Sequence, residues 1–288
     1  MATLIQTLQN VLDSKDSLLS VETKRILLKE ALQSHVLDFI YNHPAYRRLN
    51  FYGGTCLHVI YGLNRLSEDL DFDNSAEIDL SSLADDLSSY YRRTFGYESA
   101  NVKSQQGAHG VLRVTLKFPV LNSLGVSNYA NEALHLKVEI SHHKQVAVLQ
   151  STPSFYYGRS FVPIHFSLET MMAGKIIACL ERNFQRGKAG AYIKGRDFYD
   201  LLWYMQKGIQ PLPEKLSKDG KNPYTVESAI QALREKVKGI KDSDLAVDLL
   251  PMFESRTFIE GWLSSFHENF SRYAEGYLGR GTTQVLKP

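Results

Sequence analysis

The sequence predicts an α+β fold, in which a mixed sheet flanked by helices is followed by a helical C-terminal domain. From about residue 49 to residue 141, short runs of alternating apolar residues are separated by helical segments. Before Pro44 and after Pro163, apolar residues recur at helical spacing. We therefore predict two domains: residues 1–165, with the sheet and the N-terminal helices, and residues 166–288, with helices alone.

The composition is typical of a globular protein in a reducing compartment. The chain has 288 residues, 43% hydrophobic and 22% charged, enough to bury a core without disulfide or metal support. Its two cysteines, Cys56 and Cys179, are far apart and form no C-x-x-C motif. The first twenty residues contain acidic side chains and no long apolar run, unlike a signal peptide or membrane anchor. We expect a cytoplasmic protein that does not enter a membrane.

The elements follow in order along the chain. Ser20 is a suitable N-cap for a helix with a broad apolar stripe that ends before Pro44. The run "LNFY" predicts a strand, Thr55 begins a second helix, and "LDFD" predicts the next strand. The remaining predicted elements are a helix at 80–95, strands at 110–118 and 134–141, and C-terminal helices interrupted at 207–216 and 217–223.

Two aspartates of the segment "EDLDFD", Asp69 and Asp71, predict a metal site. Residues two apart in a strand share a face, so Asp69 and Asp71 project together while Leu70 and Phe72 face the core. At about 4 Å and an effective dielectric near 20, two such charges repel by roughly 4 kcal/mol. A bound cation would offset this repulsion, and oxygen ligands favour Mg²⁺.

The segment just upstream predicts an anion site. Gly53 and Gly54 let the backbone turn sharply, and Thr55 begins a helix whose free N–H groups attract a phosphate. Each feature alone has a plainer interpretation, because an isolated Asp-x-Asp is usually a solvated strand face and a Gly-Gly is usually a turn. The order strand, Gly-Gly-Thr, helix, Asp-x-Asp favours nucleotide chemistry.

That order resembles the DNA polymerase β-like nucleotidyltransferase superfamily. More closely, "GGTCLHVIYGLNRLSEDLDF" resembles the AbiEii/AbiGii nucleotidyl transferase toxin family. The similarity continues in "LKVEIS" with Glu139, in "SLETMMAGKIIACLERN" with Lys175, and in "KGRDFYDLLWYM" with Asp197. It implies that residues 1–165 contain a polymerase β-like nucleotidyltransferase core.

The resemblance also implies an activity and roles for the residues. The activity is metal-dependent transfer of a nucleoside monophosphate from an NTP to an acceptor, an RNA that we expect to be the 3′ end of tRNA. Such a toxin would block translation as part of a toxin–antitoxin or phage-defence pair, and it would have a cognate antitoxin protein. The implied roles are one or two Mg²⁺ ions on Asp69, Asp71 and Glu139; catalysis also by Lys175 and Asp197; and nucleotide binding by Gly54, Thr55, Arg65, Ser67 and Lys175. Glu139 departs from the aspartate that is frequent in the wider superfamily.

The segment "RNFQRGKAGAYIKGR", residues 182–196, is basic and contains two aromatic residues but no acidic ones. It predicts an RNA-facing surface on which Arg182, Arg186 and Lys188 bind phosphates, although a solvated face is the plainer interpretation. Two alternative functions remain open: a small-molecule nucleotidylyltransferase, and a non-catalytic nucleotide- or RNA-binding protein on the same fold.

Overall fold

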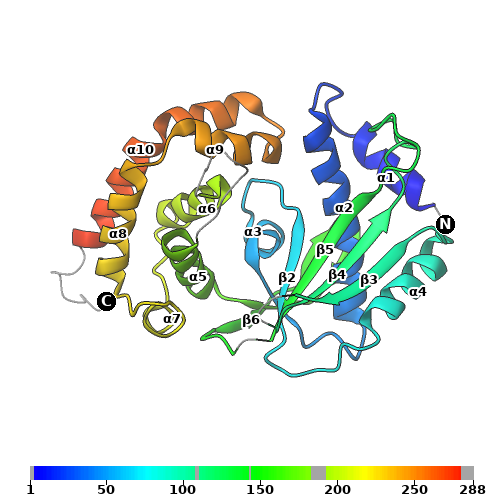
Figure 1. The fold of residues 1–288 in the computed structure, drawn as a ribbon, viewed down its shortest axis with the longest axis horizontal. Helices are drawn as coiled ribbons and strands as arrows, with labels where there is room; N and C mark the ends of the chain where they lie inside the picture. The colour runs from blue at the N-terminus through cyan, green and yellow to red at the C-terminus, as the bar shows by residue number, and fades with distance from the viewer. Residues whose placement is uncertain (1–2, 108–109, 143, 183–192, 280–288) are drawn as a thin grey trace. The chain divides into compact units, whose positions relative to one another are not determined.

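The structure is a computed structural model that describes residues 3–107, 110–142, 144–182 and 193–279. The chain forms two compact units, one of Met1–Lys144 with Leu149–Phe166 and the other of Gln145–Val148 with Ser167–Pro288. Figure 1 labels their elements by position in the chain. The α+β fold predicted from the sequence is confirmed, with strands confined to the first unit and helices filling the second.

The first unit is built on a seven-stranded mixed sheet in the order β3-β4-β5-β2-β1-β9-β6. The pairs β1–β9 and β2–β5 are parallel and the other pairs are antiparallel. The strands of this sheet are β1 Asn50–Tyr52, β2 Asp69–Asp73, β3 Asn101–Gln106, β4 Leu112–Phe118, β5 Leu134–Ser141, β6 Leu149–Ser151 and β9 Ile164–Phe166, with a separate hairpin of β7 Ser154–Tyr156 and β8 Arg159–Phe161.

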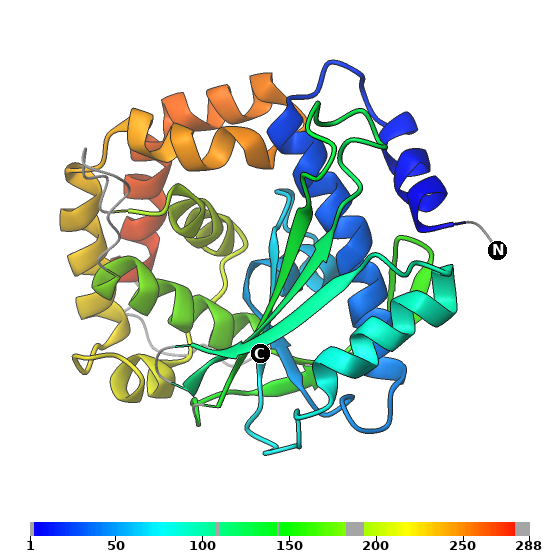
Figure 2. The same cartoon turned by 45° about the vertical axis from the view of Figure 1, so that its right-hand side comes forward.

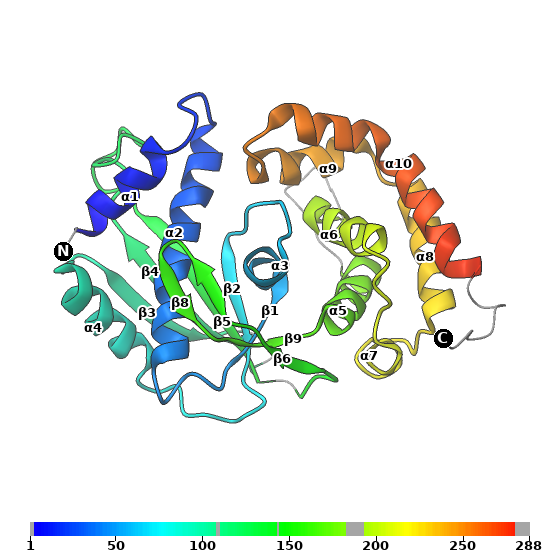
Figure 3. The same cartoon turned by 180° about the vertical axis from the view of Figure 1, so that it is seen from behind.

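The helices of this unit are α1 Leu4–Asp13, α2 Val21–Asn42, α3 Gly53–Tyr61 and α4 Leu83–Phe95. Helix α2 begins as predicted, because Ser20 Oγ accepts a hydrogen bond from Thr23 N at 3.1 Å. Tyr91 of α4 contacts Phe118 of β4 edge to face, and its hydroxyl donates to the Leu32 carbonyl of α2. Seen from behind, α2 crosses the strands (Figure 3). Helices α2 and α4 thus cover the apolar face of the sheet.

Two sequence predictions about this unit were wrong. Helix α3 begins at Gly53, two residues before Thr55, because Gly53 adopts a φ of +82° that lets the chain pass from β1 directly into the helix. The strands β6 to β9 and β3 were not predicted. Most have only three residues, too short to show an alternation of apolar and polar side chains.

The second unit consists of helices α5 Leu168–Glu181, α6 Gly195–Gln206, α7 Pro213–Lys218, α8 Val226–Lys238, α9 Asp242–Leu249 and α10 Arg256–Leu278, with a short 3₁₀ turn, η3 Leu250–Met252. Helix α10 packs along α8, as the orange-to-red and yellow ribbons show (Figure 2). Helix α7 occupies part of the stretch predicted as an interruption, since Pro213 stands at its first turn, where a proline is tolerated. No helix in the described part of the chain has the length and apolar character needed to cross a membrane.

Candidate nucleotide-binding site

Asp69 and Asp71 lie on the polar face of β2, as the sequence predicts. Leu70, which lies between the two aspartates, and Phe72, which follows Asp71, are fully buried. Both aspartates are half-buried. In the sheet, Asp71 stands between Tyr52 of β1 and Glu139 of β5. Register partners share a face, so the Asp71 and Glu139 carboxylates project from neighbouring strands on the same side.

Gly53 brings the start of α3 against Asp71. A Cβ atom placed on Gly53 would lie 2.3 Å from Asp71 Oδ2, so only glycine allows this approach. Helix α3 begins without a side-chain cap, unlike α2 and α5, which have serine caps. Its first-turn N–H groups are therefore available to an anion. A Cβ on Gly54 would likewise lie 2.6 Å from Arg65 Nη2.

The place where the start of α3, from Gly53 to Thr55, meets Asp69 and Asp71 of β2 is called the corner below. Thr55, Arg65 and Ser67 are buried next to this corner. Thr55 is fully buried, and its hydroxyl lies 2.8 Å from Ser67 Oγ and 2.5 Å from the Asp69 carbonyl oxygen. The Thr55 hydroxyl is the donor to both oxygens, so its single proton is shared between them. Arg65 donates to the Leu66 carbonyl at 2.9 Å. These three predicted nucleotide-binding side chains thus fix the backbone that precedes and carries the aspartates.

Helix α2 also stabilises this corner, because two of its residues that the sequence analysis missed form hydrogen bonds with the backbone of Ser67. Glu30 is 2% exposed and accepts a hydrogen bond from Ser67 N at 3.0 Å. Gln33 is fully buried and donates to the Ser67 carbonyl at 3.0 Å. The available signal was the position of Glu30, three residues after Leu27 and therefore on the apolar stripe of the helix, because a carboxylate there requires a specific partner.

Glu139 is held by an arginine that the sequence analysis also missed. Arg113 of β4 is the register partner of Glu139, and its Nε and Nη2 lie 2.7 and 2.6 Å from Glu139 Oε1. Asp73, the third aspartate of the strand, is 2% exposed and accepts from Asn50 Nδ2 and Ser75 N. The Asp73 carboxylate is therefore occupied by hydrogen bonds to its own surroundings.

The chemistry of Asp69 and Asp71 fits a magnesium ion. Mg²⁺ typically binds to one or two carboxylates and to substrate phosphates, so two carboxylates on one strand face provide a suitable half-site. Among the described residues, no three His, Cys, Asp or Glu side chains form a group that could hold a metal. Burial raises the pKa of the nearby Cys56 thiol, and the negative charge of Asp71 raises it further.

A second cluster lies between α5 and α6 in the helical unit. Lys175 Nζ is 2.8 Å from both Asp197 Oδ1 and Asp200 Oδ2, and Arg182 Nη1 is 2.6 Å from Asp197 Oδ2. Asp200 is fully buried, and its ion pair with Lys175 joins two neighbouring helices.

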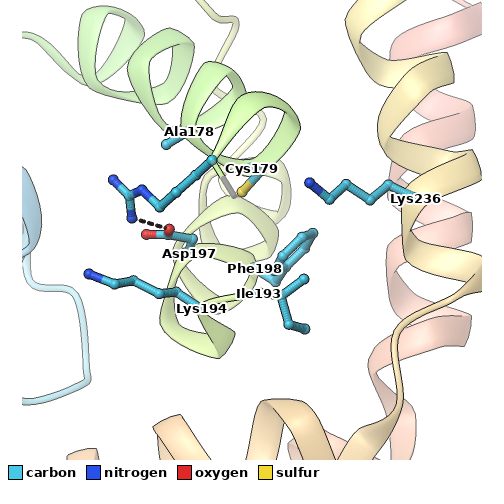
Figure 4. A pocket seen from close by; sticks show the side chains of 8 residues that line it. Ala178, Cys179, Ile193, Lys194, Asp197, Phe198 and Lys236 are labelled. Carbon is cyan, nitrogen blue, oxygen red and sulfur yellow. Dashed lines mark hydrogen bonds and ion pairs between the residues drawn. The ribbon is translucent and has the colours of Figure 1, made fainter. Parts of the chain in front are cut away.

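Asp197 stays ionised in this cluster. Burial acts to raise its pKa, but the charges of Lys175 and Arg182 and the Lys175 hydrogen bond outweigh burial and lower the pKa to about 2. Figure 4 shows Asp197 in a small pocket, hydrogen-bonded to Arg182, with Lys236 reaching in from α8. The other lining residues are Ala178, Cys179, Ile193, Lys194 and Phe198.

The predicted RNA-binding segment is only partly described. Arg182 is exposed on one side and ion-paired with Asp197 on the other. Arg186 and Lys188 lie outside the described residues. The RNA-binding role of all three stays a prediction.

Comparison with known proteins identifies the class and then the family. A family model of nucleotidyl transferases matches residues 38–280, most of the chain and parts of both units. It describes the nucleotidyl transferase AbiEii toxin of type IV toxin–antitoxin systems, and the chain belongs to this family. The resemblance inferred from the sequence is confirmed.

A solved structure is also similar. It is the crystal structure of a candidate nucleotidyltransferase from H. pylori, 19% identical, with a TM-score of 0.48, covering 87% of this chain and 92% of that one. No curated protein matches. Membership of the family makes the chain a nucleotidyl transferase toxin with a cognate antitoxin.

Proposed function

We propose that the chain transfers a nucleoside monophosphate from an NTP to an RNA acceptor, the 3′ end of tRNA, and thereby blocks translation in the cytoplasm. The observation that carries this proposal is the corner where Gly53 lets the uncapped start of α3 meet Asp71. A helix N-terminus for phosphate beside two carboxylates suits a metal-bound triphosphate.

Each residue of the corner has a proposed part. Asp69 and Asp71 would hold one or two Mg²⁺ ions, which would supply positive charge to the triphosphate oxygens. Glu139 would join them on ion binding by moving away from Arg113, since the three carboxylates do not form a metal-holding group in the structure as described. The first N–H groups of α3, at Gly54 and Thr55, bind phosphate oxygens. Arg65 and Ser67 hold the first turn of α3 in place, since both side chains are buried and lie next to Gly54. The protein contributes mainly by positioning and by charge.

In the second unit, we assign phosphate binding to Lys175 and its orientation to Asp197. The Lys175 side chain is 16% exposed and is ion-paired with Asp197 and Asp200, so its ammonium group is fixed in place. Arg182, Arg186 and Lys188 are proposed to contact the RNA backbone. We retain residues 1–165 and 166–288 as the two domains, the first carrying the transferase core.

The experiment tests transfer directly. Purified protein is incubated with Mg²⁺, each α-³²P-labelled NTP in turn and total cellular RNA. The proposal expects label in a discrete RNA band, lost with Asp69→Ala and kept with Asp73→Asn, whose aspartate is buried and hydrogen-bonded. Label in small molecules alone would favour a small-molecule nucleotidylyltransferase. NTP binding without any transfer would favour a non-catalytic binder.

A further inference from the structure

One face of strands β3, β4 and β5 carries a grid of polar side chains that continues the row of Asp69 and Asp71. In the register of the sheet, Lys137 of β5 lies beside Asp69 of β2 on one side and beside Thr115 of β4 on the other. Thr115 in turn lies beside Lys103 of β3. The next row, away from the aspartates, consists of Asn101, Lys117 and His135.

This face is open to solvent in the described structure. Lys103, His135 and Lys137 are exposed, whereas the residues that alternate with them on β4 and β5 are buried. The buried set lies under α2 and α4, as the contacts of Tyr91 with Phe118 and Leu32 show. A sheet with one covered and one polar face has this alternation.

Beyond Asp69, the two rows of this face, one of Lys137, Thr115 and Lys103 and one of His135, Lys117 and Asn101, contain no carboxylate and are positively charged. Among the residues that the structure describes, no carboxylate is ion-paired with Lys103, Lys117 or Lys137. Partial desolvation lowers the pKa of His135, and the charges of Lys117, Lys29 and Lys137 lower it further, so the lysines lie close enough to repel a proton there. On a chain of net charge +2, such a local concentration of cations fits a polyanion.

We propose that this lysine face, defined by Lys103, Lys117 and Lys137, binds the phosphate backbone of the RNA acceptor and leads its end toward Asp69. The inference rests on the proposed transfer to RNA. Neighbouring strands are about 4.8 Å apart and residues two apart along a strand about 6.7 Å. The lysines therefore begin one strand from Asp69 and extend outward over two further strands, which provides contacts for several successive phosphates.

The test compares two charge-reversal variants in the whole protein. One variant is Lys103→Glu, Lys117→Glu, Lys137→Glu. The matched control is Arg47→Glu, Arg48→Glu, Arg93→Glu, three exposed basic residues of the same unit that lie in the α2–β1 loop and in α4. Fluorescence anisotropy measures binding of a labelled RNA hairpin with a single-stranded 3′ end, at salt concentrations from about 50 to 200 mM.

The lysine variant is expected to bind at least about tenfold more weakly at low salt. The magnitude of its slope of log K against log salt should fall by about 2 to 3, because each lost phosphate contact removes about 0.7 to 0.9. The control should match the wild type. An unchanged slope in the lysine variant overturns the proposal, as does loss of antitoxin binding with RNA binding intact, which would make the face a protein interface. If the wild type binds RNA but transfers no label to it, the proposed nucleotide transfer is wrong. The comparison of RNA binding between the wild type and the lysine variant still tests the proposed role of the lysine face.

Discussion

The backbone of Gly53 lies so close to the Asp71 side chain that there is no room for a Cβ atom at position 53. A Cβ on Gly53 would lie 2.3 Å from Asp71 Oδ2 and 3.1 Å from Asp71 Cβ, and Gly53 also adopts a φ of +82° that alanine rarely takes. The first turn of α3 and the carboxylate of β2 are therefore positioned by one backbone feature. This links the proposed phosphate-binding part of the site to its proposed metal-binding part.

The first prediction is that Gly53→Ala impairs transfer far more than it impairs folding. The positive φ should lower the free energy of unfolding by about 1–2 kcal/mol. The added carbon must also displace Asp71, and a shift of about 1 Å at a reacting centre can reduce the rate roughly 100-fold. Nucleotide transfer and thermal denaturation measure the two effects.

Gly62 at the other end of α3 supplies the matched control. It has a φ of +71°, but nothing lies within 4 Å of the position of its Cβ. Gly62→Ala should therefore show a similar loss of stability with transfer retained. Equal loss of transfer in both alanine variants would mean that α3 as a whole, and not the Gly53–Asp71 contact, controls activity.

The second prediction concerns Glu139 as a metal ligand. Glu139→Gln should raise the Mg²⁺ concentration for half-maximal transfer by about tenfold or more, since an amide is a poorer Mg²⁺ ligand than a carboxylate. Its stability should change by less than about 1 kcal/mol, because the Arg113–Glu139 pair is about one-third exposed at 37% and 32%. A titration of activity against Mg²⁺ measures the shift.

Glu132→Gln is the control for this substitution. Glu132 forms a pair with Arg25 at 2.6 Å, with exposures of 34% and 30%, nearly the same as the Arg113–Glu139 pair. Its loss should leave the Mg²⁺ dependence unchanged. If Glu139→Gln behaves like Glu132→Gln, the glutamate is a partner of Arg113 only and Mg²⁺ is held by the two aspartates.

Sequence patterns predicted the parts of this molecule that depend on local periodicity. The shared face of Asp69 and Asp71 follows from alternation along one strand, and the start of α2 follows from the Ser20 cap. Both features depend on residues within a few positions of each other. For the same reason the α+β class could be predicted from the chain alone.

Features that depend on contacts between distant segments could not be predicted in this way. Asp200 pairs with Lys175 of another helix, Arg113 reaches Glu139 across a strand pair, and Glu30 holds Ser67 from α2. Nothing in one segment shows which other segment it will meet. The predicted role of Thr55 illustrates the limit, because the motif identified the residue while its buried hydroxyl bonds the Asp69 carbonyl.

The third prediction separates two ion-paired lysines of the helical unit, Lys175 and Lys215. Lys175 is paired with Asp197 and Asp200, while Lys215 is 4% exposed and paired with Asp219 at 2.6 Å. Removing either charge leaves a poorly solvated carboxylate, so Lys175→Met and Lys215→Met should each lower the free energy of unfolding, by up to about 3–5 kcal/mol. Only Lys175→Met should weaken NTP binding, as measured by titration at a temperature where both variants remain folded.

Lys175→Arg serves where the methionine variant does not fold. It keeps the charge but replaces a compact ammonium by a larger planar group, which does not place its charge at the same point. NTP affinity should fall although the fold persists. Unchanged NTP affinity in the folded Lys175 variants would assign the cluster to stability and remove Lys175 from the nucleotide site.

The fourth prediction is a pH dependence of stability that comes from His35. This histidine of α2 is 2% exposed, packs edge-on against Phe95 at 4.7 Å, and has no partner for Nδ1 among the described residues. Burial, and to a lesser extent the charge of Arg159, lowers its pKa from 6.5 to about 3. Below pH 6.5, His35 is therefore protonated in the unfolded chain but stays neutral in the folded chain until the pH approaches 3.

The sign and size follow from this difference in proton binding. The contribution of His35 to stability is complete above pH 6.5 and is lost as the pH falls, at about 1.4 kcal/mol per pH unit, or about 2 kcal/mol between pH 6.5 and 5. His35→Phe keeps an aromatic ring against Phe95 and removes the titration, so its free energy of unfolding should fall less over this range than that of the wild type. Urea denaturation at several pH values measures the difference, with His142→Gln, an exposed histidine, as the control. Parallel pH profiles for wild type and His35→Phe would show that the His35 site admits a proton in the folded state.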